Sequence, residues 1–202
     1  MEKAQMLSPK KATWRLAKII RIITVPPIMA LTVFTAFLFM DGFYTSIWEY
    51  VAAVAFIALL PITAYPLQLV IPPFKSRGRE GQRALAFVMC TLGYILGVAY
   101  GLLFSVGRPI FTMLLTYLLS GVTLLAVNLV FRFKASGHAC GLMGPLAALA
   151  YFIGPFALIS GLFLFAAAFW SSVYMKRHTA AQFAVGAAIP VAWLIVCIVL
   201  IL

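Results

Sequence analysis

Long apolar runs alternate with short polar gaps along almost the whole chain. A helix that crosses the hydrocarbon core of a bilayer needs about 20 consecutive, mostly apolar residues, and the chain supplies such runs repeatedly. We count seven of them: about 19–40, 47–71, two within 84–131 that meet at Gly107–Pro109, 139–151, one that ends near 173, and one from 179 to 202. The pattern therefore predicts an all-α fold, a polytopic membrane helix bundle with about six to seven transmembrane helices.

Two of these runs contain features that interrupt a helix. The first run has Pro26 and Pro27 near its start, where a helix either tolerates proline or kinks. The run 139–151 has only about 15 residues before the next break, which is short for a membrane crossing, so it could be a partly re-entrant helix. We divide the chain into a basic N-terminal segment, 1–18, and a single membrane domain, 19–202.

Composition supports a membrane protein and excludes a soluble globular domain. Of the 202 residues, 65% are apolar and 9% are charged, whereas a soluble domain has about 25% charged residues. The formal net charge of +11 would suggest nucleic acid as the partner of a soluble protein. Basic residues at helix ends are expected in a membrane protein, where they set the orientation and attract anionic lipids. We therefore expect membrane lipids, and no nucleic acid, as partners.

The basic residues are concentrated on one side of the predicted membrane domain. Seven spans place the gaps 72–83, 132–138 and 174–178 on the same side as the N-terminus, and that side carries fourteen of the fifteen Lys and Arg residues. Arg108 alone lies on the other side. By the positive-inside rule the N-terminal side faces the cytoplasm. This predicts a multi-pass protein of the bacterial or archaeal cytoplasmic membrane, with the loops of its active site on the cytoplasmic side.

The chain has two histidines, and each lies in one of these basic gaps. His138 ends the gap at 132–138. If the last helix starts near His178, then His178, Gln182 and Gly186 are spaced i, i+4 and i+8 and share one helix face. Gln182 can hydrogen-bond one imidazole nitrogen and leave the other as a free lone pair. Gly186 leaves room for the close approach of a neighbouring helix.

The residues before His138 form a candidate anion site. Ser136 and Gly137 precede an apolar helix, so their amides lie at its N-terminus. A helix N-terminus binds anions through free N–H groups and the helix dipole. Lys134 and Arg177 add positive charge beside it.

Two imidazoles beside an oxyanion site favour phosphoryl transfer without a metal. One histidine could attack phosphorus while the other protonates the leaving oxygen. Magnesium or calcium would need carboxylate ligands, and Glu2 and Glu80 are the only acids on that side. We therefore expect no metal and no other cofactor. The competing interpretation is a pair of interfacial histidines among basic side chains that extend to the head groups.

Two stretches resemble motifs of a known family. Ser136-Gly137-His138 is similar to the second motif, P-S-G-H, of the type 2 phosphatidic acid phosphatase (PAP2) family. Residues 171–186 resemble the third motif, S-R-x5-H-x3-D followed by a glycine, and Gln182 at the Asp position is closest to the dolichyl-diphosphatase-like branch. The motifs lie 40 residues apart with two spans between them, as in the family, and the resemblance covers about 110–200, within a core at about 75–200.

The resemblance implies an activity and a set of residue roles. His178 would be the nucleophile and form a phosphohistidine, His138 would be the general acid, and Gln182 would orient His178. Ser136 and the Gly137 amide would hold phosphate oxygens. The implied function is an integral membrane, metal-independent phosphatase that removes phosphate from a lipid phosphate or diphosphate. Phosphatidic acid, phosphatidylglycerol phosphate and polyprenyl diphosphates all fit this description.

Three positions depart from the family pattern. In the first motif, K-x6-R-P, seven residues separate Lys75 from Arg83 and the proline is absent. Ser172 stands where the family has an arginine, so either Arg177 replaces that arginine or no residue does and the enzyme is slow. Lys134 lies in the altered lead into the second motif and could itself hold phosphate. The complete predicted phosphate-binding set is Lys134, Ser136, Gly137, Arg177, Arg83, Lys75 and Ser172.

Two other functions stay open. A non-catalytic lipid-binding or scaffold protein that keeps the fold would explain Ser172 and the altered first motif. A small transporter is weakly supported by the proline-broken spans. The sequence also leaves open which lipid phosphate is the substrate and whether the chain forms homo-oligomers. The family resemblance implies an active site outside the cytoplasm, whereas the charge pattern places these gaps inside.

Overall fold

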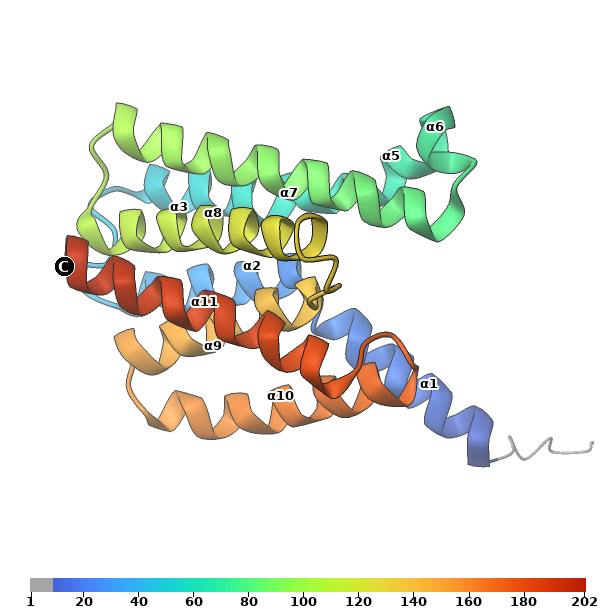
Figure 1. Ribbon diagram of the computed structural model, residues 1–202. Helices are drawn as coiled ribbons and strands as arrows, with labels where there is room; N and C mark the ends of the chain where they lie inside the picture. Colours follow the sequence, from blue (N-terminus) through green and yellow to red (C-terminus); the bar gives the residue numbers. More distant parts are fainter. Residues whose placement is uncertain (1–8) are drawn as a thin grey trace, which may run out of the picture.

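The computed structural model describes residues 9–202, which form helices and no strand (Figure 1). The predicted all-α fold is therefore confirmed over this range. Glu2 and Lys3 of the predicted basic N-terminal segment lie outside the described residues. The elements are α1 (Pro9–Ile23), α2 (Pro26–Ala36), the 3-10 helix η1 (Phe37–Phe39), α3 (Ile47–Ala53), the π-helix η2 (Val54–Leu59), α4 (Leu60–Ile62), α5 (Ala64–Val70), α6 (Pro72–Lys75), α7 (Gly78–Leu103), α8 (Arg108–Leu129), α9 (Gly137–Phe152), α10 (Phe156–Tyr174) and α11 (Ala180–Ile201).

The helices make the chain a multi-pass membrane protein. Within 9–202, four helical stretches are long and apolar enough to cross a bilayer: Ile47–Val70, α7, α8 and α11. A fifth candidate is the bent pair Lys11–Ile23 and Pro26–Phe39. The remaining apolar helices, α9 and α10, are shorter, with 16 and 19 residues, and the apolar stretch of α10 covers Ile159–Tyr174. The predicted number of six to seven spans is thus not confirmed, and four or five are shown by length and composition.

The first predicted span is not one straight helix. The axes of α1 and α2 differ by 50° at the break. Val25 is extended there (φ −63°, ψ 144°), which is the conformation that a following proline imposes, and Pro26 has no N–H to continue the helical ladder. At the end of α1, Thr24 donates both its backbone amide, at 3.1 Å, and its hydroxyl, at 2.7 Å, to the Ile20 carbonyl.

The helix α1 is amphipathic and extends obliquely from the bundle (Figure 1). It contacts α10, and Ala17 is fully buried. Its apolar residues Leu16, Ile19 and Ile23 are more than half exposed. A helix with an exposed apolar face and Lys and Arg on the opposite face suits the membrane–water interface. The boundary at 18/19, expected between a basic segment and the membrane domain, therefore falls inside one continuous helix.

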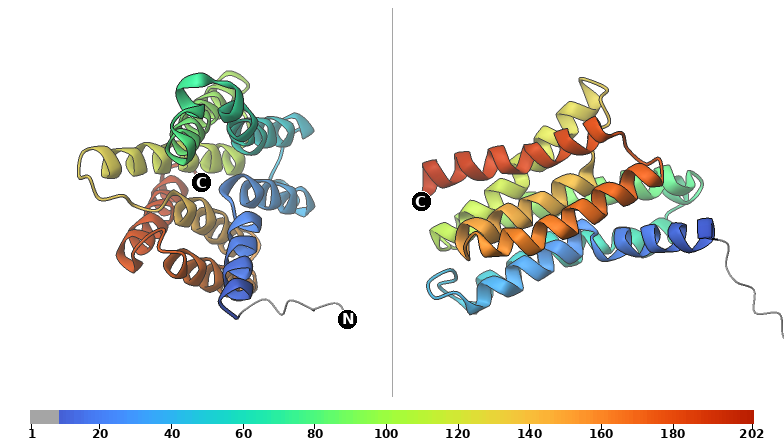
Figure 2. Two further views of the ribbon diagram at one scale, coloured as in Figure 1. Left: turned by 90° about the vertical axis from the view of Figure 1, so that its right-hand side faces the viewer. Right: turned by 90° about the horizontal axis from the view of Figure 1, so that it is seen from below.

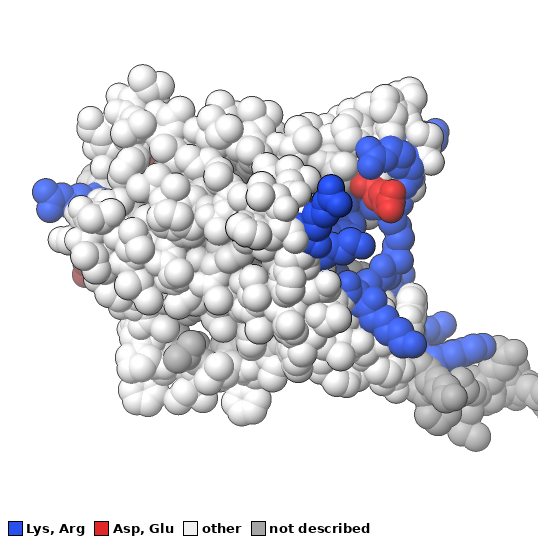
Figure 3. All heavy atoms as spheres, viewed as in Figure 1, with Lys and Arg blue, Asp and Glu red and all other residues white. Residues whose placement is uncertain are grey.

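The other helices run back and forth along one axis, with α9 at the centre (Figure 2). α9 packs against α2, α8, α10 and α11. The connections before α7, before α9 and before α11 all lie at the end where α1 emerges (Figure 1). Lys and Arg side chains gather at that end (Figure 3). As expected from the sequence, the three basic gaps share one end of the molecule.

The opposite end is held together by a buried acid. Glu49 accepts hydrogen bonds from the backbone amides of Thr45 and Gly107, both at 2.9 Å. These bonds tie the connection before α3 to the turn before α8. Arg108, which begins α8, lies at this end and not with the histidines.

Candidate functional site

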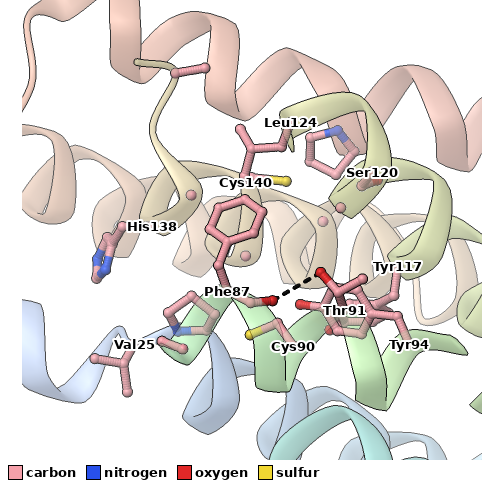
Figure 4. Close-up of a pocket in the computed structure, with 18 of the residues that line it drawn as sticks. Val25, Phe87, Cys90, Thr91, Tyr94, Tyr117, Ser120, Leu124, His138 and Cys140 are labelled. Carbon is pink, nitrogen blue, oxygen red and sulfur yellow. Dashed lines mark hydrogen bonds between the residues drawn. The ribbon is translucent and has the colours of Figure 1, made fainter. Parts of the chain in front are cut away.

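A cavity of about 300 Å³ lies between α1, α2, α5, α7, α8, α9, α11 and the connection before α11 (Figure 4). Arg21, Arg83, His138 and His178 line its polar end. Most of the remaining lining is apolar or aromatic. No Asp or Glu side chain of the described part of the chain lines it. A concave site that carries cations and lacks carboxylates attracts an anion.

The end of α10 places His178 at this cavity. The amide of Lys176 donates to the Val173 carbonyl and the amide of Arg177 donates to the Ser172 carbonyl, both at 2.9 Å. Lys176 has a left-handed backbone, with φ of 52°. This pair of bonds with a left-handed residue is the Schellman motif, which terminates a helix and reverses the chain. The reversal directs the next residue, His178, back toward the bundle.

The beginning of α11 fixes His178 from the other side. Thr179 is the N-cap residue, and its hydroxyl accepts the Gln182 amide at 3.2 Å. The Gln182 side-chain oxygen accepts the Thr179 amide at 3.1 Å, which completes a capping box. The oxygen of Gln182 is therefore bound to the backbone of Thr179, although the side chain stays close enough to His178 to affect its pKa. His178 lies between two well-satisfied helix ends, so its position is constrained.

The environment of His178 favours its neutral form. Burial lowers the pKa of His178 below its ordinary value, and Arg83 lowers it further, whereas the Gln182 side chain and the Lys134 backbone raise it. The Nδ1 atom of His178 is buried and has no hydrogen-bond partner among residues 9–202. A neutral imidazole with an unpartnered nitrogen can act as a nucleophile near pH 7.

His138 lies in the first turn of α9. Ser136 is the N-cap residue of that helix, and its hydroxyl accepts the Ala139 amide at 3.2 Å. The amide of Gly137 belongs to the first turn, where N–H groups have no acceptor within the helix. The Nε2 atom of His138 is 2.9 Å from the Thr24 hydroxyl at the end of α1. The ring is thereby held toward the cavity that Gly137 and His138 both line.

The two histidine segments touch each other directly. The Ser136 amide donates to the Gln182 carbonyl at 2.9 Å. A Cβ atom added at Gly186 would overlap the Ser136 carbonyl oxygen and lie 2.9 Å from the Ser136 nitrogen. The expectation that Gly186 permits a close approach is confirmed, and the neighbour is the segment that carries His138. The expectation that His178 shares a helix face with Gln182 and Gly186 is wrong, because α11 begins at Ala180 and Thr179 before it is extended, so His178 precedes the helix.

An arginine that sequence reasoning did not assign to the site completes its polar end. Arg21 of α1 donates from Nη1 to the Ser172 hydroxyl at 2.9 Å, although the two residues are 151 positions apart in the sequence. Ser172 is fully buried. A guanidinium group thus lies next to the position where the family pattern has an arginine. The available signal was that Arg21 interrupts an apolar run, and a charge inside such a run is more often functional than one in a loop.

The remaining predicted phosphate-binding residues differ in their positions relative to the cavity. Gly137 and Arg83 line the cavity together with the histidines, whereas Ser136 is buried and caps α9. Lys75 on α6 and Lys134 before α9 are exposed, and Arg177 is half-buried. None of these three cations lines the cavity.

No family model matches the chain, and comparison with curated proteins and with solved structures finds no significant match. The interpretation of the site therefore depends on its own geometry and on the two motif-like segments.

Proposed function

We propose that the protein is a membrane-embedded lipid phosphate phosphatase that acts through a phosphohistidine and without a metal. The observation that carries this proposal is the meeting of two histidines from separate polar gaps. They lie at one end of a cavity together with Arg21 and Arg83, and the cavity has no carboxylate among its described lining residues. A non-catalytic lipid-phosphate-binding protein would use the same cations, so catalysis must be tested directly.

In the proposed first step His178 attacks phosphorus. The bond between phosphorus and the lipid oxygen breaks, and His138 gives a proton to that oxygen. Burial and the charge of Arg21 lower the pKa of His138, so His138 must take up this proton when the phosphate anion binds beside it. In the second step water attacks the phosphohistidine, His138 accepts a proton from the water, and inorganic phosphate leaves. The free Nδ1 atom of His178 and the presence of His138 at the same cavity support these roles.

Arg21 is the residue we assign to the missing arginine of the third motif. A planar guanidinium can bind two phosphate oxygens at once and neutralise the charge of the transition state. Its hydrogen bond to Ser172 holds it at the cavity. Arg83 and the Gly137 amide provide further positive charge and an N–H donor. Basic groups of this kind contribute about 10³-fold or more to the rate of phosphoryl transfer.

The test is phosphate release by purified protein in EDTA from phosphatidic acid, phosphatidylglycerol phosphate and a polyprenyl diphosphate. We expect turnover of at least one lipid, its abolition in His178→Ala, and a loss of about 10³-fold in Arg21→Gln. Arg15→Gln is the matched control, because Arg15 is an exposed arginine on the same helix and does not line the cavity. Binding of lipid phosphates without hydrolysis of any of them would contradict the enzymatic proposal.

A further inference from the structure

The cavity continues from the histidines into the apolar interior of the bundle. Figure 4 shows His138 at one end and Tyr94 and Tyr117 toward the other, with Phe87 and Leu124 along the way. Because the phosphate is proposed to bind at the polar end, the deeper part would receive the lipid portion of the substrate. The inference below rests on the proposed function.

Some hydroxyl groups along this deeper part are already satisfied. Thr91 donates to the Phe87 carbonyl at 2.9 Å (Figure 4). Thr116 donates to the Thr112 carbonyl at 2.7 Å. Both side chains bond to the preceding turn of their own helix, so their hydroxyl groups are not free to donate to a ligand.

Two other hydroxyl groups are not satisfied. The hydroxyl oxygens of Tyr117 and Ser120 are buried and have no hydrogen-bond partner within the described chain. The two residues line the cavity and are only 8% and 4% exposed. Buried polar groups without partners are unfavourable and uncommon in proteins. Two such groups on neighbouring turns of α8 indicate a ligand atom that accepts hydrogen bonds.

The distance of Ser120 and Tyr117 from the proposed phosphate site can be estimated along the axis of α8. A Cβ atom added at Gly137 would lie 3.4 Å from the Leu124 side chain, so Leu124 marks the level of the proposed phosphate site. Tyr117, Ser120 and Leu124 are spaced i, i+3 and i+7 and share one face of α8. At 1.5 Å per residue, Ser120 lies about 6 Å and Tyr117 about 10 Å deeper than Leu124.

We propose that Ser120 and Tyr117 donate hydrogen bonds to an ester carbonyl of the lipid, and that the substrate is a diacylglycerol phosphate. In such a lipid the ester carbonyls follow the phosphate by only a few bonds of the glycerol, which matches the depth of the two hydroxyl groups. A polyprenyl chain has no hydrogen-bond acceptor at any depth, so it would leave both hydroxyl groups unsatisfied.

The test compares phosphate release from diacyl phosphatidic acid, its dialkyl ether analogue with equal chain lengths, and a polyprenyl phosphate. Wild-type protein should turn over the diacyl lipid roughly threefold to tenfold faster than the ether analogue. The net free energy of one hydrogen bond corresponds to about this ratio of rates. Tyr117→Phe and Ser120→Ala should each lower diacyl turnover toward the ether rate and leave the ether rate unchanged. Tyr100→Phe, at a tyrosine that does not line the cavity, should preserve the preference.

The inference would be overturned if wild-type protein turned over the diacyl and ether lipids at equal rates, or if Tyr117→Phe lost equal activity on both lipids. Water would then be the hydrogen-bond partner of the two hydroxyl groups. The proposed function would still stand if His178→Ala abolished turnover of any lipid phosphate. If no lipid is hydrolysed, the proposed function fails. Thermal stabilisation by the diacyl lipid relative to the ether lipid then tests the hydroxyl pair alone, and equal stabilisation would overturn it.

Discussion

Replacing Gly186 by alanine should separate the two histidine segments. The added Cβ atom would overlap the Ser136 carbonyl oxygen and lie 3.0 Å from the Ser136 carbonyl carbon. Carbon atoms in favourable contact are about 3.5–4.0 Å apart, so the beginning of α9 must move by roughly 0.5–1 Å from α11. The obstacle is backbone and cannot rotate away as a side chain can. The movement would also stretch the hydrogen bond from the Ser136 amide to the Gln182 carbonyl, now 2.9 Å.

Two opposing contributions set the effect of Gly186→Ala on stability. Overpacking of this kind costs about 1–3 kcal/mol, whereas alanine is favoured over glycine inside a helix by about 1 kcal/mol. The net change should be a loss of about 0–2 kcal/mol, small enough for the variant to fold. Displacement of catalytic groups by about 1 Å can reduce turnover by about 10²-fold. We therefore expect a large loss of phosphate release with a small change in Tm.

Gly161→Ala is the control for this prediction. Its added Cβ atom would lie 2.8 Å from Cδ2 of Leu146, which is the end of a flexible side chain on a different pair of helices. This variant should keep wild-type turnover. The assay is phosphate release from one lipid phosphate together with thermal unfolding of the same preparations. Wild-type turnover in Gly186→Ala would refute the conclusion that the contact with Ser136 positions the histidines.

Three further predictions address the arginine, the pH dependence and the orientation. Ser172→Arg should lower turnover, because a second guanidinium would lie against Arg21, the donor to Ser172; higher turnover would show that Arg21 does not replace the family's arginine. Because burial lowers the pKa of His178 below its ordinary 6.5, the nucleophile is neutral at pH 7, and the acid limb of the kcat/KM profile should be centred below pH 6.5; an acid limb centred at or above pH 6.5 would contradict this. Single cysteines at Ser76 and Ser46, which lie at opposite ends of the bundle, test orientation: an impermeant reagent applied to intact cells should label position 46 and not 76.

The helices were predictable because membrane spans depend on local apolar runs. A close neighbour at Gly186 was predictable, since glycine lets backbones approach. The identity of that neighbour was not predictable, and His178 does not share a helix face with Gly186, because α11 begins only at Ala180. The place of Arg21 was not predictable, because it depends on how α1, which precedes the bend at Val25, packs against α10, and no local sequence pattern specifies that packing. The bond between Gln182 and Thr179 was missed because a capping box competes with the neighbouring imidazole for the same side chain.

The measurement that tests the central claim most directly is the search for a phosphoenzyme. Purified protein in EDTA is mixed with a lipid phosphate, quenched rapidly at alkaline pH, and its phosphorylated residue is located by mass spectrometry. The account predicts an acid-labile phosphohistidine at His178 that is absent from His178→Ala. Turnover that proceeds with no phosphorylated histidine, or with phosphorylation of a residue other than His178, would contradict it.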